Sequence, residues 1–271
     1  MAGGIISRTR CPPTEPVRSL QSHPNQKCLI AVGGNLHNSP QIFRDALAQL
    51  HLAGCRDVEI SRLKRTRAAG ENAGNDFLNA AAVLQTSQSP EELLNTLHQI
   101  EMEFGRTRLQ HWGPRTLDLD LILYGDVALN SPQLVVPHPA MWYRRFVLDP
   151  AVEVASEMVH PILGESIARL HARLCCRPLN LELCAHGPAS QTSDCDKVLD
   201  SVRGLWTDLQ WSVVESETQV SPDVFARISL QPKQPRSGIQ PFNPAGREVV
   251  VVGSVSEMVS EIEQLKKAML G

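Results

Sequence analysis

The sequence lacks the features that mark membrane-spanning, secreted and nucleic-acid-binding proteins. No apolar run is long enough to cross a bilayer, and the first residues have no apolar stretch of the secretory type. The formal net charge is only -3, without the basic excess that nucleic-acid-binding domains carry. We therefore expect neither a membrane nor a nucleic acid as partner.

The cysteines also lack a recognisable pattern. There are seven, with no CxxC pair and no His/Cys spacing typical of a metal site. They stand at positions 11, 28, 55, 175, 176, 184 and 195. An odd, scattered set argues against a disulfide framework and favours reduced thiols. We predict a cytoplasmic protein on this basis.

Length and composition indicate a folded chain with more than one unit. The chain has 271 residues, of which 42% are hydrophobic, so a sizeable core is expected. Residues 1–26 contain four prolines and predict an unstructured tail in preference to a targeting helix. The composition shifts near residue 177. We predict one domain over 27–176 and a small α/β domain over 177–271.

Hydrophobic periodicity over residues 27–124 predicts a specific order of elements. Strands are expected near 27–35, 58–60, 77–84 and 116–124, helices at 39–54 and 89–105, and a polar loop at 64–76. Further helical patterns follow at 149–156 and 164–174. The order strand, helix, strand, strand, helix, strand is that of a ferredoxin-like α+β sandwich with a largely antiparallel sheet.

The region after residue 177 has weaker signals. Apolar positions from Val198 to Leu209 predict a helix, and strands are expected near 211–216, 224–230 and 247–253. Ser254 and Glu257 form a capping box for a last helix. No motif in this region indicates a chemistry.

The segment TLDLDLILY carries two carboxylates at strand spacing. Alternation places its four leucines on one face and Asp118, Asp120, Ile122 and Tyr124 on the other. The two carboxylates would stand about 7 Å apart and, at an effective dielectric of 20, repel by roughly 2 kcal/mol. A magnesium ion would remove that repulsion. For a bare pair of this kind, a half-exposed strand with two solvated aspartates is the better interpretation.

Cationic residues next to the pair favour the metal site. Arg106, Arg108, His111 and Arg115 precede it within one polar loop. Guanidinium groups bind the phosphate oxygens that a metal leaves uncovered. The combination predicts a metal–polyphosphate site.

The segment HWGPRTLDLDLILY resembles the signature of the 6-hydroxymethyl-7,8-dihydropterin pyrophosphokinase family of folate biosynthesis. Four further segments follow the family's order, and the resemblance covers about residues 27–175. They are AVGGNL (31–36), DFLNAA (76–81), IEMEFGRTR (100–108) and VPHPAMWYRRFVL (136–148). The resemblance implies the ferredoxin-like fold and diphosphoryl transfer from ATP to a hydroxymethyl dihydropterin, with release of AMP.

The resemblance also implies roles for individual residues. Asp118 and Asp120 would hold two magnesium ions, and Arg106 and Arg115 would act on the transferring group. The nucleotide would be bound by His98, Glu101, Arg108, His138 and Arg144. The pterin would be bound by Thr66, Phe77, Asn79, Trp112 and Phe146. Gly34 departs from the family, which usually has serine there, and so does the loop TRAAG (66–70) on the pterin side.

Two other interpretations stay open at this point. One is a two-metal nucleotidyltransferase, which would need a further acidic ligand and a nucleic-acid track. The other is a nucleotide-binding relative that has lost catalysis, which the presence of Asp118, Asp120, Arg106 and Arg115 disfavours. The C-terminal domain could steady the catalytic domain, mediate oligomerisation or bind another folate-pathway enzyme.

Overall fold

The computed structural model describes residues 25–35, 39–67, 76–105, 116–185, 197–198, 200–201, 209–214, 224–231, 248–252 and 255–270. The larger of its sheets is built from the first part of the chain. Its strands are β1 (Gln26–Gly34), β2 (Arg56–Ile60), β3 (Lys64–Thr66), β4 (Phe77–Thr86) and β5 (Asp118–Tyr124). They lie in the order β2-β4-β1-β5, with β3 also paired to β4, and every pairing is antiparallel. With α1 (Ser39–Leu52) and α2 (Pro90–Glu103) between the strands, this order confirms the predicted ferredoxin-like fold.

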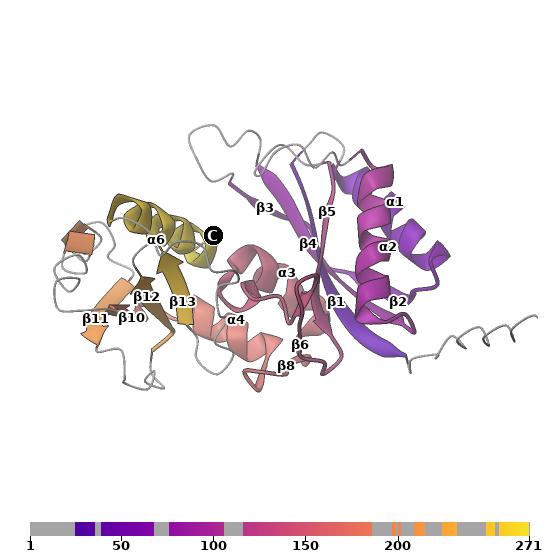
Figure 1. Ribbon diagram of the computed structural model, residues 1–271. Helices are drawn as coiled ribbons and strands as arrows, with labels where there is room; N and C mark the ends of the chain where they lie inside the picture. The colour runs from indigo at the N-terminus through magenta and orange to yellow at the C-terminus, as the bar shows by residue number, and fades with distance from the viewer. Residues whose placement is uncertain are drawn as a thin grey trace, which may run out of the picture.

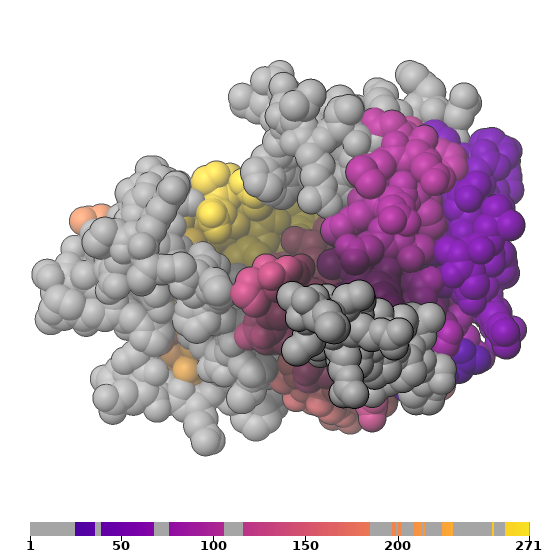
Figure 2. Space-filling view, turned by 45° about the vertical axis from the view of Figure 1, so that its right-hand side comes forward, coloured from indigo at the N-terminus to yellow at the C-terminus, as the bar shows by residue number. Residues whose placement is uncertain are grey.

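The two faces of the larger sheet are covered by different helices. Helices α1 and α2 lie on one face, which Figure 2 shows as the outer surface at one side of the molecule. Phe43 and Leu50 of α1 and Leu97 of α2 are fully buried there against the sheet. Helices α3 (Arg145–Ala155) and α4 (Ile167–Cys175) lie on the side of the other face (Figure 1).

Helix α2 shows how local sequence sets an element's limits. Ser89 Oγ accepts a hydrogen bond from the Glu92 amide, the Glu92 carboxylate accepts one from the Ser89 amide, and Pro90 occupies the first turn. This is a capping box, and it starts the helix at the predicted position. Gly105 follows the helix with a positive φ of 82°, a conformation in which glycine ends helices without strain.

Strand β5 contains a bulge that the sequence did not reveal. Leu29 of β1 pairs with Leu123, but the next residue, Ile30, pairs with Leu121, so Ile122 is an extra residue. The expected alternation is therefore wrong beyond this point. Leu123 packs in the α3-side cluster, and Tyr124 packs in the α1–α2-side cluster. Asp118 and Asp120 precede the bulge and stay on one face.

Shorter elements follow the larger sheet. They are β6 (Leu129–Asn130), β7 (Val135–Val136), the 3-10 helix η1 (Met141–Tyr143), β8 (Val159–His160) and β9 (Glu165–Ser166). Strands β6 and β7 pair as one antiparallel ladder, and β8 and β9 pair as another. The loop predicted over 64–76 was wrong for its first three residues, because Lys64–Thr66 forms β3 beside β4.

The C-terminal region forms a second, parallel sheet. Its strands are β10 (Leu179–Ala185), β11 (Leu209–Val214), β12 (Ala226–Gln231) and β13 (Glu248–Val252), in the order β11-β10-β12-β13. Helix α6 (Val255–Leu270) follows. The α/β extension is thus confirmed, but β10 was not predicted. The predicted helix up to Leu209 was wrong at its end, because Leu209 begins β11.

One hydrophobic cluster joins the two sheets. It contains Leu29 of the larger sheet, Leu148 of α3, Leu170 of α4, Leu181 of β10 and Ile262 of α6. Figure 1 shows α3 and α4 between the two sheets. Burial of this kind is worth about 25 cal/mol per Å² of apolar surface, so each unit contributes to the stability of the other. The domain boundaries at residues 26 and 176 remain predictions.

Among the described residues, no helix combines the length and apolarity needed to cross a membrane.

Cys28, Cys55 and Cys184 are buried, whereas Cys175 and Cys176 are exposed. Burial raises the pKa of the Cys28 thiol to about 12, so this cysteine stays protonated and unreactive near neutral pH.

His160 makes stability depend on pH. It is 1% exposed, and its Nδ1 accepts hydrogen bonds from the amides of Ile162 and Leu163 at 3.3 and 3.2 Å. Burial lowers the pKa of His160 from 6.5 to about 4. As the pH falls, the His160 side chain is therefore protonated in the unfolded chain before it is protonated in the folded one. The free energy of unfolding is highest above pH 6.5 and falls progressively towards pH 4.

We expect the free energy of unfolding of His160→Asn to fall less at acid pH than that of the wild type. The pKa shift of His160 lowers the free energy of unfolding of the wild type at acid pH by roughly 2–3 kcal/mol, because one pKa unit corresponds to 1.36 kcal/mol. Urea unfolding of both proteins at about pH 7 and pH 4.5 measures this difference. An unchanged pH dependence in the variant would show that His160 does not titrate with folding.

Candidate active site

The antiparallel register brings residues of three strands side by side. Gly33 of β1 pairs with Asn79 of β4 on one side and with Asp118 of β5 on the other. Asp120 pairs with Ala31, two residues before Gly33. Directly paired residues share a face of the sheet. Asn79, Asp118 and Asp120 therefore lie on the α3 side, where Ala31 packs against the cluster that contains α3.

Gly33 keeps a gap between the amide and the carboxylate. A Cβ atom placed on this residue would lie 3.5 Å from Asn79 Oδ1 and 3.8 Å from Asp118 Cβ. Any larger side chain would stand between the two functional groups. Gly33 has no distinctive signal in the sequence, because a glycine pair at the end of an apolar strand indicates a turn as readily as a close approach of two groups.

Asn79 is held in a fixed orientation. Its side chain is 8% exposed, and its Nδ2 donates a hydrogen bond to Thr66 Oγ1 at 2.8 Å. Thr66 pairs with Phe77 across β3 and β4, and Phe77 shares a face with Asn79 two residues later. The structure thus brings three residues of the predicted pterin set to one place.

His138 follows β7 and is a neutral hydrogen-bond donor near pH 7. Its Nδ1 accepts a hydrogen bond from the Ala140 amide at 3.1 Å, so the proton of the neutral ring is on Nε2. Burial and, to a smaller extent, the charge of Arg144 lower the pKa of His138 from 6.5 to about 4, while the Asp118 carboxylate acts in the opposite direction. The amide of His138 donates a hydrogen bond to the carbonyl of Ile122 in β5 at 3.0 Å, so this residue lies beside the strand that carries Asp118.

Arg144 and Phe146 stand at the start of α3. Arg144 is the N-cap residue of this helix, and its guanidinium carbon lies 5.5 Å from the centre of the Phe146 ring. Both side chains are half-buried. The guanidinium group and the positive end of the helix dipole together favour an anion here.

Glu101 reaches the site from the opposite face of the sheet. Its side chain is 1% exposed, and its Oε1 accepts a hydrogen bond from the amide of Leu119 at 2.7 Å. Leu119 lies between Asp118 and Asp120, so Glu101 fixes the backbone that carries both carboxylates. His98 lies one helical turn earlier on α2. The nucleotide role of His98 and Glu101 stays a prediction.

The remaining predicted residues, Arg106, Arg108, Trp112 and Arg115, lie outside the described residues. Their roles therefore stay predictions. Among the described residues, His138 lies beside β5 through its hydrogen bond to Ile122, and Thr66, Phe77 and Asn79 lie on the same side of the sheet as Asp118.

Gly34 has a structural reason for departing from serine. A Cβ atom there would lie 2.8 Å from the backbone carbonyl oxygen of Thr116, closer than real Cβ contacts. We expect Gly34→Ala and Gly34→Ser to lower the free energy of unfolding by about 1–3 kcal/mol, the usual cost of overpacking. Gly33→Ala is the matched control, because its contacts of 3.5 and 3.8 Å are ordinary for a Cβ. Urea unfolding of the variants checks this, and equal stability of Gly34→Ala and wild type would contradict it.

Comparisons with known proteins match the part of the chain that contains these site residues. A family model described as 7,8-dihydro-6-hydroxymethylpterin-pyrophosphokinase (HPPK) matches residues 29–156. A Synechocystis protein named 2-amino-4-hydroxy-6-hydroxymethyldihydropteridine pyrophosphokinase is 44% identical over 155 residues, which cover 56% of this chain and 79% of that protein. The family match ends before the C-terminal sheet.

Longer proteins contain a similar segment. The Arabidopsis thaliana protein named "Folate synthesis bifunctional protein, mitochondrial" is 35% identical over 144 residues, which are 53% of this chain and 26% of that protein. A solved Plasmodium falciparum HPPK-DHPS structure matches with a TM-score of 0.45 and 11% identity, over 70% of this chain and 58% of that chain.

Proposed function

This chain belongs to the 7,8-dihydro-6-hydroxymethylpterin-pyrophosphokinase family, and we propose that its active site lies where Asn79, Asp118 and His138 meet on the α3 side of the larger sheet. The chain is accordingly a pyrophosphokinase of folate biosynthesis. It transfers the diphosphoryl group of ATP to the hydroxymethyl group of a dihydropterin. The observation that carries the proposed location is the register that aligns Asn79, Gly33 and Asp118.

The carboxylate pair fits magnesium. Asp118 and Asp120 offer oxygen donors from one face of β5, which is the donor type that magnesium prefers. The absent side chain of Gly33 leaves space beside Asp118. We assign both residues as ligands of two magnesium ions. Bound there, magnesium would neutralise phosphate charge and polarise the substrate hydroxyl group.

The nucleotide lies on the His138 and Arg144 side in this proposal. The Nε2–H group of His138 donates to a phosphate oxygen, and the Arg144 guanidinium adds positive charge. Protonation is not needed for that donation, which agrees with the low pKa of His138. His98, Glu101 and Arg108 complete the nucleotide set, and Arg106 and Arg115 act on the transferring group.

The pterin lies on the Asn79 side. Because Nδ2 of Asn79 donates to Thr66, its Oδ1 faces Gly33 and accepts from the pterin's amide edge. Phe77 and Phe146 offer aromatic faces to the flat ring, and Trp112 completes the set. This arrangement places the hydroxymethyl group towards Asp118.

The reaction exchanges one phosphorus–oxygen bond for another. The hydroxymethyl oxygen attacks the β-phosphorus of ATP and loses its proton. The bond from the β-phosphorus to the oxygen bridging to the α-phosphate breaks, and AMP leaves. The chain's own residues contribute position and charge, which dominate catalysis of phosphoryl transfer.

Asn79→Ala tests the pterin assignment. We expect KM for the hydroxymethyl dihydropterin to rise by about 10- to 100-fold, since losing a buried hydrogen-bonding partner costs about 1–3 kcal/mol. KM for ATP should change little. Steady-state kinetics with each substrate varied separately measures both constants. A rise confined to KM for ATP would contradict the assignment, and Asn79→Asp is the matched variant of nearly the same shape.

Two further points remain predictions. A cytoplasmic location is expected from the reduced thiols. The C-terminal sheet with α6 is a candidate surface for another folate-pathway enzyme, in keeping with the names of longer relatives such as the Arabidopsis protein.

A further inference from the structure

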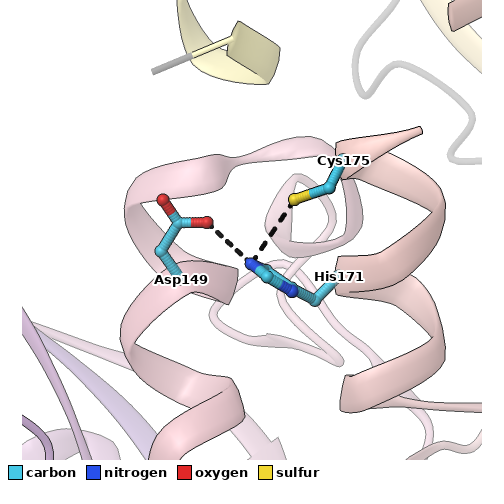
Figure 3. A group of neighbouring side chains, drawn as sticks. All are labelled: Asp149, His171 and Cys175. Atoms are coloured by element: carbon cyan, nitrogen blue, oxygen red, sulfur yellow. Dashed lines mark hydrogen bonds and ion pairs between the residues drawn. The ribbon is translucent and has the colours of Figure 1, made fainter. Parts of the chain in front are cut away.

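A cluster of three metal-ligating side chains lies away from the active site, between α3 and α4. Asp149 comes from α3, whereas His171 and Cys175 come from the last two turns of α4 (Figure 3). His171 Nε2 lies 2.9 Å from Asp149 Oδ1 and 3.6 Å from Cys175 Sγ. The three ligand atoms all lie within 4.8 Å of one another.

We propose that Asp149, His171 and Cys175 form a binding site for Zn²⁺. Nitrogen, sulfur and carboxylate oxygen donors select zinc, whereas magnesium takes oxygen donors. With zinc–sulfur and zinc–nitrogen distances of about 2.3 and 2.0 Å, tetrahedral geometry separates the sulfur and nitrogen atoms by about 3.5 Å. The observed separation of Cys175 Sγ and His171 Nε2 is 3.6 Å. Asp149 would withdraw by a few tenths of an ångström.

The surroundings of the cluster suit a bound cation. Arg145 lies one turn before Asp149, and its Nε and one terminal nitrogen donate to the two oxygens of this carboxylate at 3.0 and 2.9 Å. Hydrogen bonds of this kind orient carboxylates that ligate metals. Arg145 also donates to the carbonyl of Leu270 at the end of α6, at 3.5 Å. A bound ion would thus join α3 and α4 at their seam with the C-terminal helix.

Access and charge are also adequate. Cys175 is exposed, so solvent reaches the sulfur atom, and Asp149 and His171 are about one quarter exposed. On binding, the thiol of Cys175 releases its proton to solvent and a thiolate–metal bond forms. The carboxylate and thiolate then offset the two charges of zinc, the Arg145 guanidinium adds one positive charge beside Asp149, and water fills the fourth position of the tetrahedron. The site has no local signal in the sequence, because Asp149 lies 22 residues before His171.

Cobalt provides a spectroscopic probe of the site. The reduced, metal-free full chain is titrated with Co²⁺ in excess Mg²⁺, which supplies the oxygen sites. We expect one equivalent of Co²⁺ to bind with a thiolate-to-cobalt charge-transfer band that Zn²⁺ abolishes. Cys175→Ser should lose the band, and His171→Ala should weaken binding by at least about tenfold. Cys176→Ser, an exposed neighbour outside the cluster, should keep the band.

Thermal unfolding gives a second measurement. Zn²⁺ should raise the unfolding midpoint of the wild type and of Cys176→Ser but not of Cys175→Ser, because ligands stabilise the state that binds them. The proposal is overturned if the wild type shows no charge-transfer band, if Cys175→Ser keeps it, or if Cys176→Ser loses it. Pyrophosphokinase activity does not enter these tests, so their outcome is independent of the active-site assignment.

Discussion

Asp118→Ala and Asp120→Ala are each expected to lower turnover by about 1,000-fold. Loss of a metal ligand removes several kcal/mol of charge stabilisation from the transition state, and each 1.36 kcal/mol corresponds to a factor of ten. Initial rates of AMP formation at saturating ATP, magnesium and pterin measure the effect. Near-normal turnover in both variants would refute the metal assignment.

Stability of the same variants separates a catalytic role from a structural one. The two aspartates share one sheet face, so their like charges repel each other. Removing one charge should therefore leave the free energy of unfolding unchanged or raise it. Asp126→Asn is a matched control, because this exposed carboxylate follows β5 directly. We expect it to alter neither turnover nor stability.

Removal of residues 177–271 is expected to destabilise the remaining chain by several kcal/mol or to cause aggregation. The cluster that contains Leu148 and Leu170 continues into β10, β12 and α6, so truncation exposes apolar side chains of α3 and α4. Urea unfolding and size-exclusion chromatography of the truncated chain measure the outcome. Unchanged stability and kinetics would instead establish the C-terminal sheet as an independent module.

A point variant tests the same contact without deleting chain. Phe225, just before β12, is 6% exposed, and its ring centre lies 5.7 Å from that of Trp142 in η1. Phe225→Ala is expected to cost about 3–5 kcal/mol, the usual range for a large core residue. The destabilisation caused by Phe225→Ala should extend to the strands of the larger sheet. Hydrogen exchange of β1 and β5 amides would detect that extension, and exchange changes confined to the C-terminal strands would contradict it.

The order of elements in the first half could be predicted because each has a strong local signal. Ser89, Glu92 and Gly105 mark the limits of α2, and the buried strands β1 and β4 are continuous apolar runs. The ferredoxin-like order follows from these elements without knowledge of any distant contact. The shared face of Asp118 and Asp120 follows from strand geometry alone.

What could not be predicted depends on partner strands. The bulge at Ile122 exists because of its register with β1, and it reverses the faces of Leu123 and Tyr124. Strand β3 is a strand because β4 lies beside it. Strand β10 lies inside a parallel sheet. Its buried Glu182 forms an ion pair of 2.7 Å with Arg227 of β12. A buried charged pair from distant segments has no local signal.

Within the site, the sequence identified residue types better than their contacts. The resemblance predicted Asn79 and Asp118 separately, whereas their alignment on either side of Gly33 required the sheet register. It assigned Glu101 to the nucleotide, while the structure shows its carboxylate on the Leu119 amide between the aspartates. The location of the continuous core between two sheets also required the three-dimensional arrangement.

Product analysis tests the central claim most directly. The full chain is incubated with ATP, magnesium and 6-hydroxymethyl-7,8-dihydropterin, and the nucleotide and pterin products are separated by chromatography. We predict AMP and the pterin diphosphate in equal amounts, with loss of both products on chelation of magnesium. Formation of ADP or free pyrophosphate in place of AMP and the pterin diphosphate, or no pterin-dependent turnover, would contradict the account.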